Sequence, residues 1–293
     1  MNQPHPLCVF DSELDHFIRE DVPYFDLTTL ALGIGDASGM ISFATRHPTV
    51  ICGTEEAARI LERCGATVTL CMASGTLLAA GTLFLSATGT AQALHQAWRV
   101  ALSLLEYVSG IATRTRELVT AAQQINPQVA VVTTRKVFPG TKALAVKAIL
   151  AGGAMPHRLG LSETVLIFAQ HLAFLGGWAG LIERLPALRQ QCQEKKIGVE
   201  VERLEDALML AAAGVDVVQF DKLPPSALQE AVVVLKRDYP QLLVVAAGGI
   251  IQANVQAYAA TGADVLATTA VYSGKPVDIQ VSISRTPTGN SLS

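Results

Sequence analysis

The fold is decided by residues 197–268, where four apolar runs alternate with helical stretches. The runs are IGVEV (197–201), VDVVQF (215–220), LLVVAA (242–247) and DVLAT (264–268). Between them lie helix-like segments over residues 204–213, 226–237 and 253–260, all containing several alanines. Near-continuous apolar strands connected by helices are typical of a parallel sheet with both faces covered. The sequence therefore predicts an α/β fold for this part of the chain.

Two earlier runs, VAVVTT (129–134) and VLIF (165–168), extend the same pattern towards the N-terminus. The clearer strands end in residues with useful chemistry, namely Arg135 and Lys136, Glu200, Asp221, and Gly248 with Gly249. In an α/β barrel all these carboxyl ends converge on one rim, whereas a doubly wound sheet gathers only those at its switch point. We therefore favour a barrel, with the doubly wound sheet as the alternative.

The first hundred residues instead indicate a smaller domain of mixed α and β structure. Thr54 is a candidate cap for a helix over residues 55–64, with Gly65 just past its end. Short apolar runs divided by Gly75, Gly81 and Gly89 predict small hairpins. Residues 91–118 have a long helical pattern, which we expect to be interrupted around Ser109 and Gly110.

The composition excludes several classes of protein. Half of the 293 residues are apolar, 16% are charged, and the formal net charge is −3. This composition excludes a disordered chain and argues against charge-driven binding to nucleic acid or to an anionic membrane. The length accommodates two domains, or a barrel with an appendage.

The N-terminus, the uncharged run over residues 164–182 and the cysteines bear on location. The first residues contain no basic and apolar segments of the signal-peptide kind. The uncharged run contains Gln170, His171 and two adjacent glycines, which favour a break between elements over membrane insertion. Five cysteines without metal-ligand spacing predict reduced, mostly buried thiols. We therefore expect a cytoplasmic protein.

A stretch without acidic residues is the first functional signal. Between Glu117 and Glu163 there is no Asp or Glu, yet the stretch contains Arg135, Lys136, Lys142, Lys147, His157 and Arg158. Guanidinium groups bind carboxylates and phosphates bidentately, and lysine acts as a point charge. We predict that Arg135, Lys136 and Arg158 bind an anion, the alternative being a solvated surface. Lys142 and Lys147 fall in a helical stretch, where we expect both to face solvent.

Glu200 and Asp221 form the acidic counterpart on successive predicted strands. Paired carboxylates near a phosphate site commonly hold Mg²⁺, whose shell is completed by water and substrate oxygens. We predict a metal or ribose contact for this pair, the alternative being a salt bridge to the basic residues. Glu202, Glu205 and Asp206 are expected to be solvent-facing charges at the start of a helix.

Gly248 and Gly249 follow a late strand and precede a helix expected from about Gln252. A Gly-Gly turn in this position exposes backbone N–H groups to a phosphate, although glycine pairs are also ordinary turn residues. A cationic pocket, a carboxylate pair and a phosphate cradle on one rim suit a pyrophosphate-bearing sugar and a second anionic or polar substrate. The residues by themselves indicate transfer chemistry on such a ligand.

The order of motifs is specific to one family. The stretches that carry the resemblance are Glu20-Asp21, Asp26-Leu27-Thr28-Thr29, residues 109–113, Thr134-Arg135-Lys136, Pro139-Gly140, Gly152-Gly153, residues 157–161, residues 199–202, Asp221 and residues 248–250. With these, the chain resembles the nicotinate-nucleotide pyrophosphorylase family, also called quinolinate phosphoribosyltransferases, over nearly its whole length. The resemblance implies an N-terminal α/β sandwich and an incomplete α/β barrel of about six strands.

The resemblance also implies domain boundaries and an assembly. The sandwich domain would comprise residues 1–112, joined by the C-terminal tail 271–293, and the barrel domain residues 113–270. The family forms homodimers in which each active site borrows from the neighbour's N-terminal domain. Arg99, ten residues before Ser109, takes the place of the arginine that is donated across the dimer.

The implied reaction joins ribose from phosphoribosyl pyrophosphate to a ring nitrogen and releases pyrophosphate. By position, Arg135, His157 and Arg158 would hold the acidic group of the acceptor, and Lys136 would bridge the acceptor and the donor. Glu200 and Asp221 would bind the ribose hydroxyls and Mg²⁺, with Lys136 completing the implied catalytic set. Ala247, Gly248, Gly249 and Thr269 take the phosphate-binding positions.

Four positions depart from the family pattern. Phe168 stands where a lysine is usual, Ala247 replaces a serine, Lys222 an asparagine and Thr269 a glycine. Loss of one charge-assisted contact to a bound anion costs about 1.5–3 kcal/mol, which is a ten- to hundredfold loss of affinity. With these changes the chain resembles the ModD branch of the family, which is named for its association with molybdenum transport genes. The resemblance implies an acceptor other than quinolinate. An ordinary quinolinate enzyme of NAD synthesis and a non-catalytic anion- or nucleotide-binding protein remain the alternatives.

Overall fold

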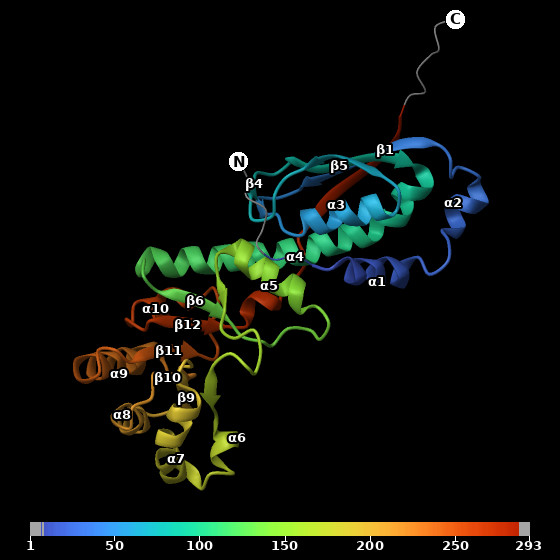
Figure 1. Ribbon diagram of the computed structural model, residues 1–293. Coiled ribbons are helices and arrows are strands. Elements are labelled where there is room, and N and C mark those ends of the chain that lie inside the picture. The colour runs from blue at the N-terminus through green and yellow to red at the C-terminus, as the bar shows by residue number, and fades with distance from the viewer. Residues whose placement is uncertain (1–6, 8, 287–293) are drawn as a thin grey trace, which may run out of the picture. The chain divides into compact units, whose positions relative to one another are not determined.

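The computed structural model describes residue 7 and residues 9–286, and it divides into two compact units. The first unit contains the chain up to Arg116, residues 138–153 and the segment from Gly274 onwards; the second contains residues 117–137 and 154–273. Figure 1 shows the chain coloured by residue number, from blue at the N-terminus to red at the C-terminus. Cys8, one of the five cysteines, lies outside the described residues.

The second unit is built on a seven-stranded sheet in the order β7-β6-β12-β11-β10-β9-β8, and all neighbouring strands are parallel. The strands are β6 (Ala130–Thr133), β7 (Met155–Pro156), β8 (Val165–Ile167), β9 (Ile197–Val201), β10 (Val217–Asp221), β11 (Leu243–Ala247) and β12 (Val265–Thr268). Because β7 and β8 do not pair with each other, the barrel is incomplete, as predicted. All six expected strands are present, and β7, only two residues long, is a seventh that the sequence pattern did not indicate.

The helices of this unit follow the predicted alternation. They are α6 (Ala169–Leu172), α7 (Gly177–Gln191), α8 (Leu204–Ala212), α9 (Pro225–Asp238), α10 (Val255–Ala259) and the short 3₁₀ turn η1 (Ala270–Tyr272). Figure 1 shows α8 and α9 alongside β9, β10 and β11. Each buries small or branched apolar residues, such as Ala207 and Leu210 on α8 and Leu228 and Val232 on α9, on the side facing its neighbours. Their apolar spacing is therefore that of helices covering a sheet.

The first unit contains a four-stranded antiparallel sheet in the order β13-β1-β5-β3. Its strands are β1 (Ser38–Thr45), β3 (Thr67–Cys71), β5 (Leu83–Thr90) and β13 (Ile279–Arg285), with a separate short pair of β2 (Thr49–Val50) and β4 (Leu77–Leu78). The helices are α1 (Asp11–Asp21), α2 (Leu27–Leu32), α3 (Thr54–Arg63), α5 (Lys142–Gly152) and the long α4 (Ala91–Ile125). β13 pairs with β1 from the far end of the chain, with Ile283 opposite Ile41. The C-terminal segment therefore completes the sheet of the first unit.

Two local predictions in the first unit were wrong. Thr54 is the first residue of α3 and not its cap; Gly53, in the left-handed region at φ +78°, takes the cap position. The long helix α4 continues through Ser109 and Gly110 without interruption. The buried Ser109 hydroxyl accepts a hydrogen bond from Cys52 N and donates one to Cys52 O, so it does not compete with the helix backbone.

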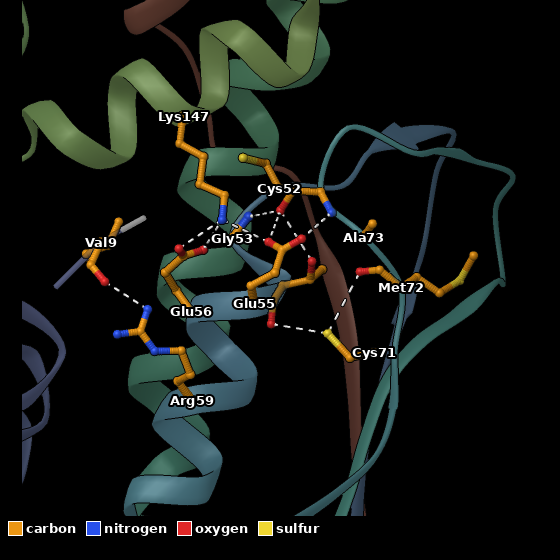
Figure 2. Close-up of polar contacts among 12 residues, drawn as sticks. Val9, Cys52, Gly53, Glu55, Glu56, Arg59, Cys71, Met72, Ala73 and Lys147 are labelled. Atoms are coloured by element: carbon orange, nitrogen blue, oxygen red, sulfur yellow. Dashed lines mark hydrogen bonds and ion pairs between the residues drawn. The ribbon is translucent and has the colours of Figure 1, made fainter. Parts of the chain in front are cut away.

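The expected exposure of Lys147 was also wrong. Its side chain is almost completely buried, and its ammonium group donates to both carboxylates at the start of α3, at 2.9 Å from Glu55 Oε2 and 2.6 Å from Glu56 Oε2. Figure 2 shows Lys147 reaching from its helix towards both glutamates. The pairing joins residues about ninety positions apart in the chain, a contact that local spacing does not reveal. Lys142, in the same helix, is exposed as predicted.

The structure also bears on the uncharged run and on the cysteines, from which the location of the protein was predicted. In the part of the chain that the structure describes, no helix is long and apolar enough to cross a membrane. The uncharged run over residues 164–182 is divided among β8, α6 and the start of α7. The four described cysteines, at positions 52, 64, 71 and 192, are free thiols as predicted. Only Cys52 is fully buried, however, so the expectation of mostly buried thiols was wrong.

Candidate functional site

The basic residues of the second unit come together through strand pairing. β6 pairs with β7, and His157 N donates to Thr133 O at 2.9 Å, so Arg158 emerges from the sheet beside the turn that carries Arg135. Burial lowers the pKa of Arg158, and the nearby charge of Arg135 lowers it further. Within the described residues, neither guanidinium has a carboxylate within ion-pair distance. Two neighbouring cations without an ion-pair partner favour an anionic ligand.

His157 directly precedes Arg158, and its backbone N–H donates a hydrogen bond to Thr133 of β6. It is half-buried, and both burial and the charge of Arg158 lower the pKa of its imidazole. The ring is therefore neutral at neutral pH and offers one N–H donor and one acceptor nitrogen. An acidic group held by the two arginines would find a hydrogen-bond donor here, and not a third full charge.

A pocket of about 910 Å³ opens beside the two arginines. Arg135, Arg158, Phe168 and His171 line one part, and residues 161–166 and 190–195 line the rest. The guanidinium carbon of Arg158 lies 5.8 Å from the centroid of the Phe168 ring. The Phe168 and His171 rings are stacked, with centroids 5.9 Å apart and planes inclined by 24°. Phe168 therefore contributes an aromatic surface where the family resemblance implies a lysine.

Glu200 and Asp221 end neighbouring parallel strands. The register of β9 and β10 sets Gln219 opposite Glu200, and Gln219 Nε2 donates to Glu200 Oε2 at 2.8 Å. Burial raises the pKa of Glu200 against the effect of this hydrogen bond, and the charge of Asp221 raises it further, whereas that of Lys136 lowers it. Asp221 itself forms an ion pair with the adjacent Lys222, at 3.5 Å, and not with the arginines. The two carboxylates and Lys136 are thus close enough to influence one another.

The Gly-Gly turn lies against Asp221. Gly248 has φ +81°, and a Cβ on it would collide with Asp221 Oδ1 and the Lys222 side chain. Lys222, itself left-handed at φ +57°, donates its backbone N–H to Ala247 O at 2.7 Å. Glycine is therefore required at position 248 by both conformation and space.

The segment after the turn differs from the prediction. Helix α10 starts at Val255, three residues later than expected, and is only five residues long. Asn254 holds the intervening turn, since its side chain accepts from Ile251 N at 2.8 Å and donates to Gly249 O at 2.9 Å. Thr269, the last of the predicted phosphate positions, lies beside the basic turn, with its Oγ1 3.4 Å from Thr134 Oγ1. The predicted phosphate residues thus lie at the same strand ends as the predicted cations.

Arg99 is placed in the other unit. It lies on α4 with its guanidinium carbon 5.2 Å from the centroid of the Trp98 ring. It lines a pocket of about 500 Å³ together with Asp26, Thr29, His95 and Trp98, all from the first unit. Thr29 Oγ1 links Asp26 to His95 Nδ1, at 2.5 and 2.8 Å. Within this unit Arg99 is exposed and available to a ligand or a second chain.

Two residues of the site were missed from the sequence. Gln219 is a buried polar residue inside an apolar strand, and its Oε1 has no partner within the described residues. A glutamine in the run VDVVQF was a visible signal, because buried polar side chains need partners. His171 follows Phe168 by three residues, and the turn that brings the rings together is not visible in the apolar pattern.

The residues present fit a magnesium ion. Within the described chain there is no group of three or more His, Cys, Asp or Glu side chains that could hold a metal. Mg²⁺, however, is commonly bound by one or two carboxylates and is completed by waters and substrate phosphates. Glu200 and Asp221 supply such a pair. Burial is the main cause of the raised pKa of Glu200, and the charge of Asp221 adds to it; a bound cation would offset both effects.

Two family models cover most of the chain. The Quinolinate phosphoribosyl transferase N-terminal domain matches residues 26–109, and the Quinolinate phosphoribosyl transferase C-terminal domain matches residues 111–282. The chain belongs to this family. Membership makes it an enzyme of the phosphoribosyltransferase type, and it agrees with the resemblance found in the motifs.

Individual relatives refine this placement. A Rhodobacter capsulatus protein named "Putative pyrophosphorylase ModD" is 43% identical over 83% of this chain and 93% of its own length. A Methanothermobacter thermautotrophicus protein named "Probable nicotinate-nucleotide pyrophosphorylase [carboxylating]" is 30% identical over 91% of this chain and 96% of its own. The crystal structure of NadC from Streptococcus pyogenes matches with a TM-score of 0.85 at 25% identity, covering 94% of this chain and 96% of that one. Both sequence and fold therefore agree with the family.

Proposed function

We propose that this protein transfers the phosphoribosyl group of phosphoribosyl pyrophosphate to an acceptor other than quinolinate, with release of pyrophosphate. One observation carries the proposal. Arg135 and Arg158, which have no ion-pair partner among the described residues, lie at the carboxyl ends of the parallel strands. The carboxylates of Glu200 and Asp221 lie at the carboxyl ends of other strands of the same sheet. The edge formed by these strand ends can bind an acidic acceptor beside a sugar phosphate. The similarity to the ModD relative supports the same reading.

The residues divide the work between the two substrates. Arg135, His157 and Arg158 bind the acidic group of the acceptor. Lys136 directly follows Arg135 in the chain, and its charge acts on Glu200, so it can contact acceptor and donor together. The backbone of Ala247, Gly248 and Gly249 and the hydroxyl of Thr269 hold phosphate oxygens. Bond cleavage at the sugar builds negative charge on the departing pyrophosphate, and these fixed donors stabilise it.

Glu200 and Asp221 bind the ribose hydroxyls and a magnesium ion. When bound, Mg²⁺ supplies positive charge that offsets the charge developing on pyrophosphate. Asp221 forms an ion pair with Lys222, and Glu200 accepts a hydrogen bond from Gln219, so both carboxylates are positioned before substrate arrives.

The acceptor differs from quinolinate because Phe168 offers no charge to a second carboxylate. The second candidate, a carboxylating nicotinate-nucleotide pyrophosphorylase of NAD synthesis, is favoured by the similarity to the Methanothermobacter protein. A non-catalytic protein that binds an anion or nucleotide through the same arginines is the third candidate.

The proposal extends to assembly and location. Arg99 is exposed near the apolar residues Leu27 and Leu32, which line the same pocket, and this supports a homodimer that completes its active sites across subunits. Small anionic molecules are the expected substrates; nucleic acid and membrane insertion are not expected. Free thiols support a cytoplasmic location. The name ModD of a relative is the support for a link to molybdenum transport.

Pyrophosphate release tests the function. Purified protein is incubated with phosphoribosyl pyrophosphate and Mg²⁺ and a panel of aromatic acids. Release that depends on an acceptor, and that is strongly reduced in Lys136→Ala and Glu200→Gln, is the expected result. Quinolinate turnover equal to that of the Streptococcus pyogenes NadC protein would favour the second candidate. Thermal stabilisation by phosphoribosyl pyrophosphate without release for any acceptor would favour the third.

A further inference from the structure

The pocket beside Arg158 combines one strong anion site with an aromatic surface. The Arg158 guanidinium lies over the Phe168 ring, and the His171 ring stacks against the same phenylalanine. A planar ligand in this pocket that packs against Phe168 would therefore also lie close to a guanidinium group. Aromatic contacts and cation–π contacts both favour the binding of an aromatic acid.

The charges that line the pocket fit a single carboxylate. Arg135 and Arg158 lie close together, and guanidinium forks can hold one carboxylate bidentately. Lys195 also lines the pocket, but it is exposed and follows the equally exposed Glu194. Glu163, the other acid of the lining, accepts the backbone N–H of Leu159, and its negative charge raises the pKa of Arg158 against the effects of burial and Arg135. Within the described lining there is no second cluster of cations for a second carboxylate.

His171 adds a neutral donor. Its Nδ1 accepts the backbone N–H of Phe168 at 3.0 Å. With Nδ1 as the acceptor, the other ring nitrogen, Nε2, is left as the donor of this exposed residue. The aromatic surface thus has a hydrogen-bond donor at its border without carrying a full charge.

We infer that the acceptor is a planar heteroaromatic acid with one carboxylate, which Arg135 and Arg158 bind while the ring packs against Phe168. This inference rests on the proposed function and specifies the substrate class of the same site. In the transfer, the lone pair of the ring nitrogen forms a bond to the ribose C1. The bond from C1 to the pyrophosphate oxygen breaks, and pyrophosphate leaves with that electron pair. The carboxylate stays on the ring, so one nucleotide and one pyrophosphate form and no CO₂ is released.

Binding of two unreactive probes separates ligand class from catalysis. Benzoate and phthalate have the same ring with one or two adjacent carboxylates, and neither has a ring nitrogen that could react. Titration calorimetry with the full chain, in the presence of phosphoribosyl pyrophosphate and Mg²⁺, is expected to give at least tenfold tighter binding of benzoate than of phthalate. Tighter binding of phthalate to the unaltered protein would overturn the inference.

A matched pair of variants tests the role of Phe168. Phe168→Lys supplies the missing cation and is expected to shift the preference at least tenfold towards phthalate, whereas Phe168→Leu is expected to weaken benzoate without such a shift. Phe174→Lys adds the same charge at a residue that is 92% exposed and does not line the pocket, and it is expected to leave the preference unchanged. An equal shift in Phe174→Lys would mean that net charge and not the site determines the preference, against the inference.

Measurements of turnover then distinguish the proposed phosphoribosyl transfer from the inferred class of acceptor. Pyridine-2-carboxylate and pyridine-3-carboxylate are compared with pyridine-2,3-dicarboxylate for pyrophosphate release and for CO₂. Release with a monocarboxylate and no CO₂ supports both proposals. Benzoate selectivity without any pyrophosphate release would contradict the function but retain the ligand class. Release with the dicarboxylate as the preferred acceptor would retain phosphoribosyl transfer and overturn the ligand class.

Discussion

Lys147, on α5, forms a buried ion pair with Glu56, on α3, with its Nζ 2.6 Å from Glu56 Oε2. The same ammonium group also donates to Glu55, so one cation serves two carboxylates. Ser74 also stabilises the Glu55 carboxylate, since its backbone N–H and its hydroxyl both donate hydrogen bonds to it. The contacts fasten residues 138–153, which follow a strand of the second unit in sequence, to the first unit. Figure 2 shows how the three charged side chains converge.

Removal of Lys147 should destabilise the protein strongly. In Lys147→Met the two glutamates lose their cation while Glu56 remains buried, and breaking a buried pair costs about 3–5 kcal/mol. Urea unfolding followed by circular dichroism measures the change. Lys142→Met in the same helix, where the side chain is exposed, should change the free energy of unfolding by less than about 0.5 kcal/mol. Similar values for both variants would show that the ion pair has little energetic weight.

The acid sensitivity of the same cluster follows from Glu55. Burial acts to raise the pKa of its carboxyl, but the hydrogen bonds from Ser74 and Lys147 outweigh burial and lower it from 4.5 to about 2. Glu55 therefore contributes stability that is fully present above pH 4.5 and is lost as the pH falls towards 2. A shift of this size corresponds to at most about 3 kcal/mol. The stability difference between the unaltered protein and Glu55→Gln should be constant from pH 7 to 5 and shrink below pH 4.5; a constant difference down to pH 3 would contradict this.

The strands of the barrel were predicted correctly from the sequence, whereas the burial of Lys147 was not, and the difference has a physical reason. Strands such as 197–201 and 243–247 are recognisable because burial on both faces makes nearly every residue apolar. Lys147 occupies a helix with apolar residues on several sides, and a charged residue there is most often exposed. Only the position of Glu55 and Glu56 in space, set by tertiary packing, makes its burial possible.

The Gly-Gly turn offers a comparison of two neighbouring glycines. Both have positive φ, at +81° and +74°, but a Cβ at Gly248 would collide with Asp221 whereas the space beside Gly249 is open. Gly249→Ala should therefore cost only the backbone strain of about 1 kcal/mol, and Gly248→Ala should cost more and displace Asp221. Thermal unfolding and the apparent affinity for phosphoribosyl pyrophosphate measure the two effects. Equal losses in both variants would mean that backbone conformation alone matters.

The candidate site was predictable in its charges but not in its neighbours. Arg135, Glu200 and Asp221 could be selected because each lies at or just past the end of an apolar strand, and parallel strands gather such ends. Arg158 could be selected only because it lies in the stretch without acidic residues, since the short β7 was not predicted. The aromatic stack of Phe168 and His171 depends on a four-residue helix that no periodicity reveals. Gln219 was missed because its strand was interpreted only by its apolar residues.

The cysteines should differ sharply in reactivity. Burial raises the pKa of the Cys52 thiol to about 12, so almost no thiolate exists at pH 8. Cys71 is exposed, although burial of its sulfur raises its pKa as well. Iodoacetamide at pH 8 should label Cys71 slowly and Cys52 only after unfolding in urea, as mass spectrometry of peptides would show. Labelling of Cys52 in the folded protein at a rate similar to Cys71 would exclude the buried environment.

His157 provides a test of the electrostatics of the site without any substrate. Burial lowers the pKa of its imidazole first, and the charge of Arg158 lowers it further. Because the pKa of His157 is lower in the folded protein, the unfolded chain binds a proton more readily. Protonation of His157 therefore lowers the free energy of unfolding as the pH falls below the ordinary value of 6.5. In Arg158→Gln the pKa of His157 should rise while staying below 6.5, because burial remains.

Imidazole chemical shifts recorded by NMR across pH 4 to 8 follow this titration, with His157→Gln used to assign the signal. Arg184→Gln, an exposed arginine of α7 whose charge does not contribute to the shift, is the matched control and should leave the titration unchanged. An unchanged pKa in Arg158→Gln would place the guanidinium too far from His157 for both to bind one carboxylate. A rise confined to that variant means that the two side chains share the electrostatic environment that an acidic acceptor requires.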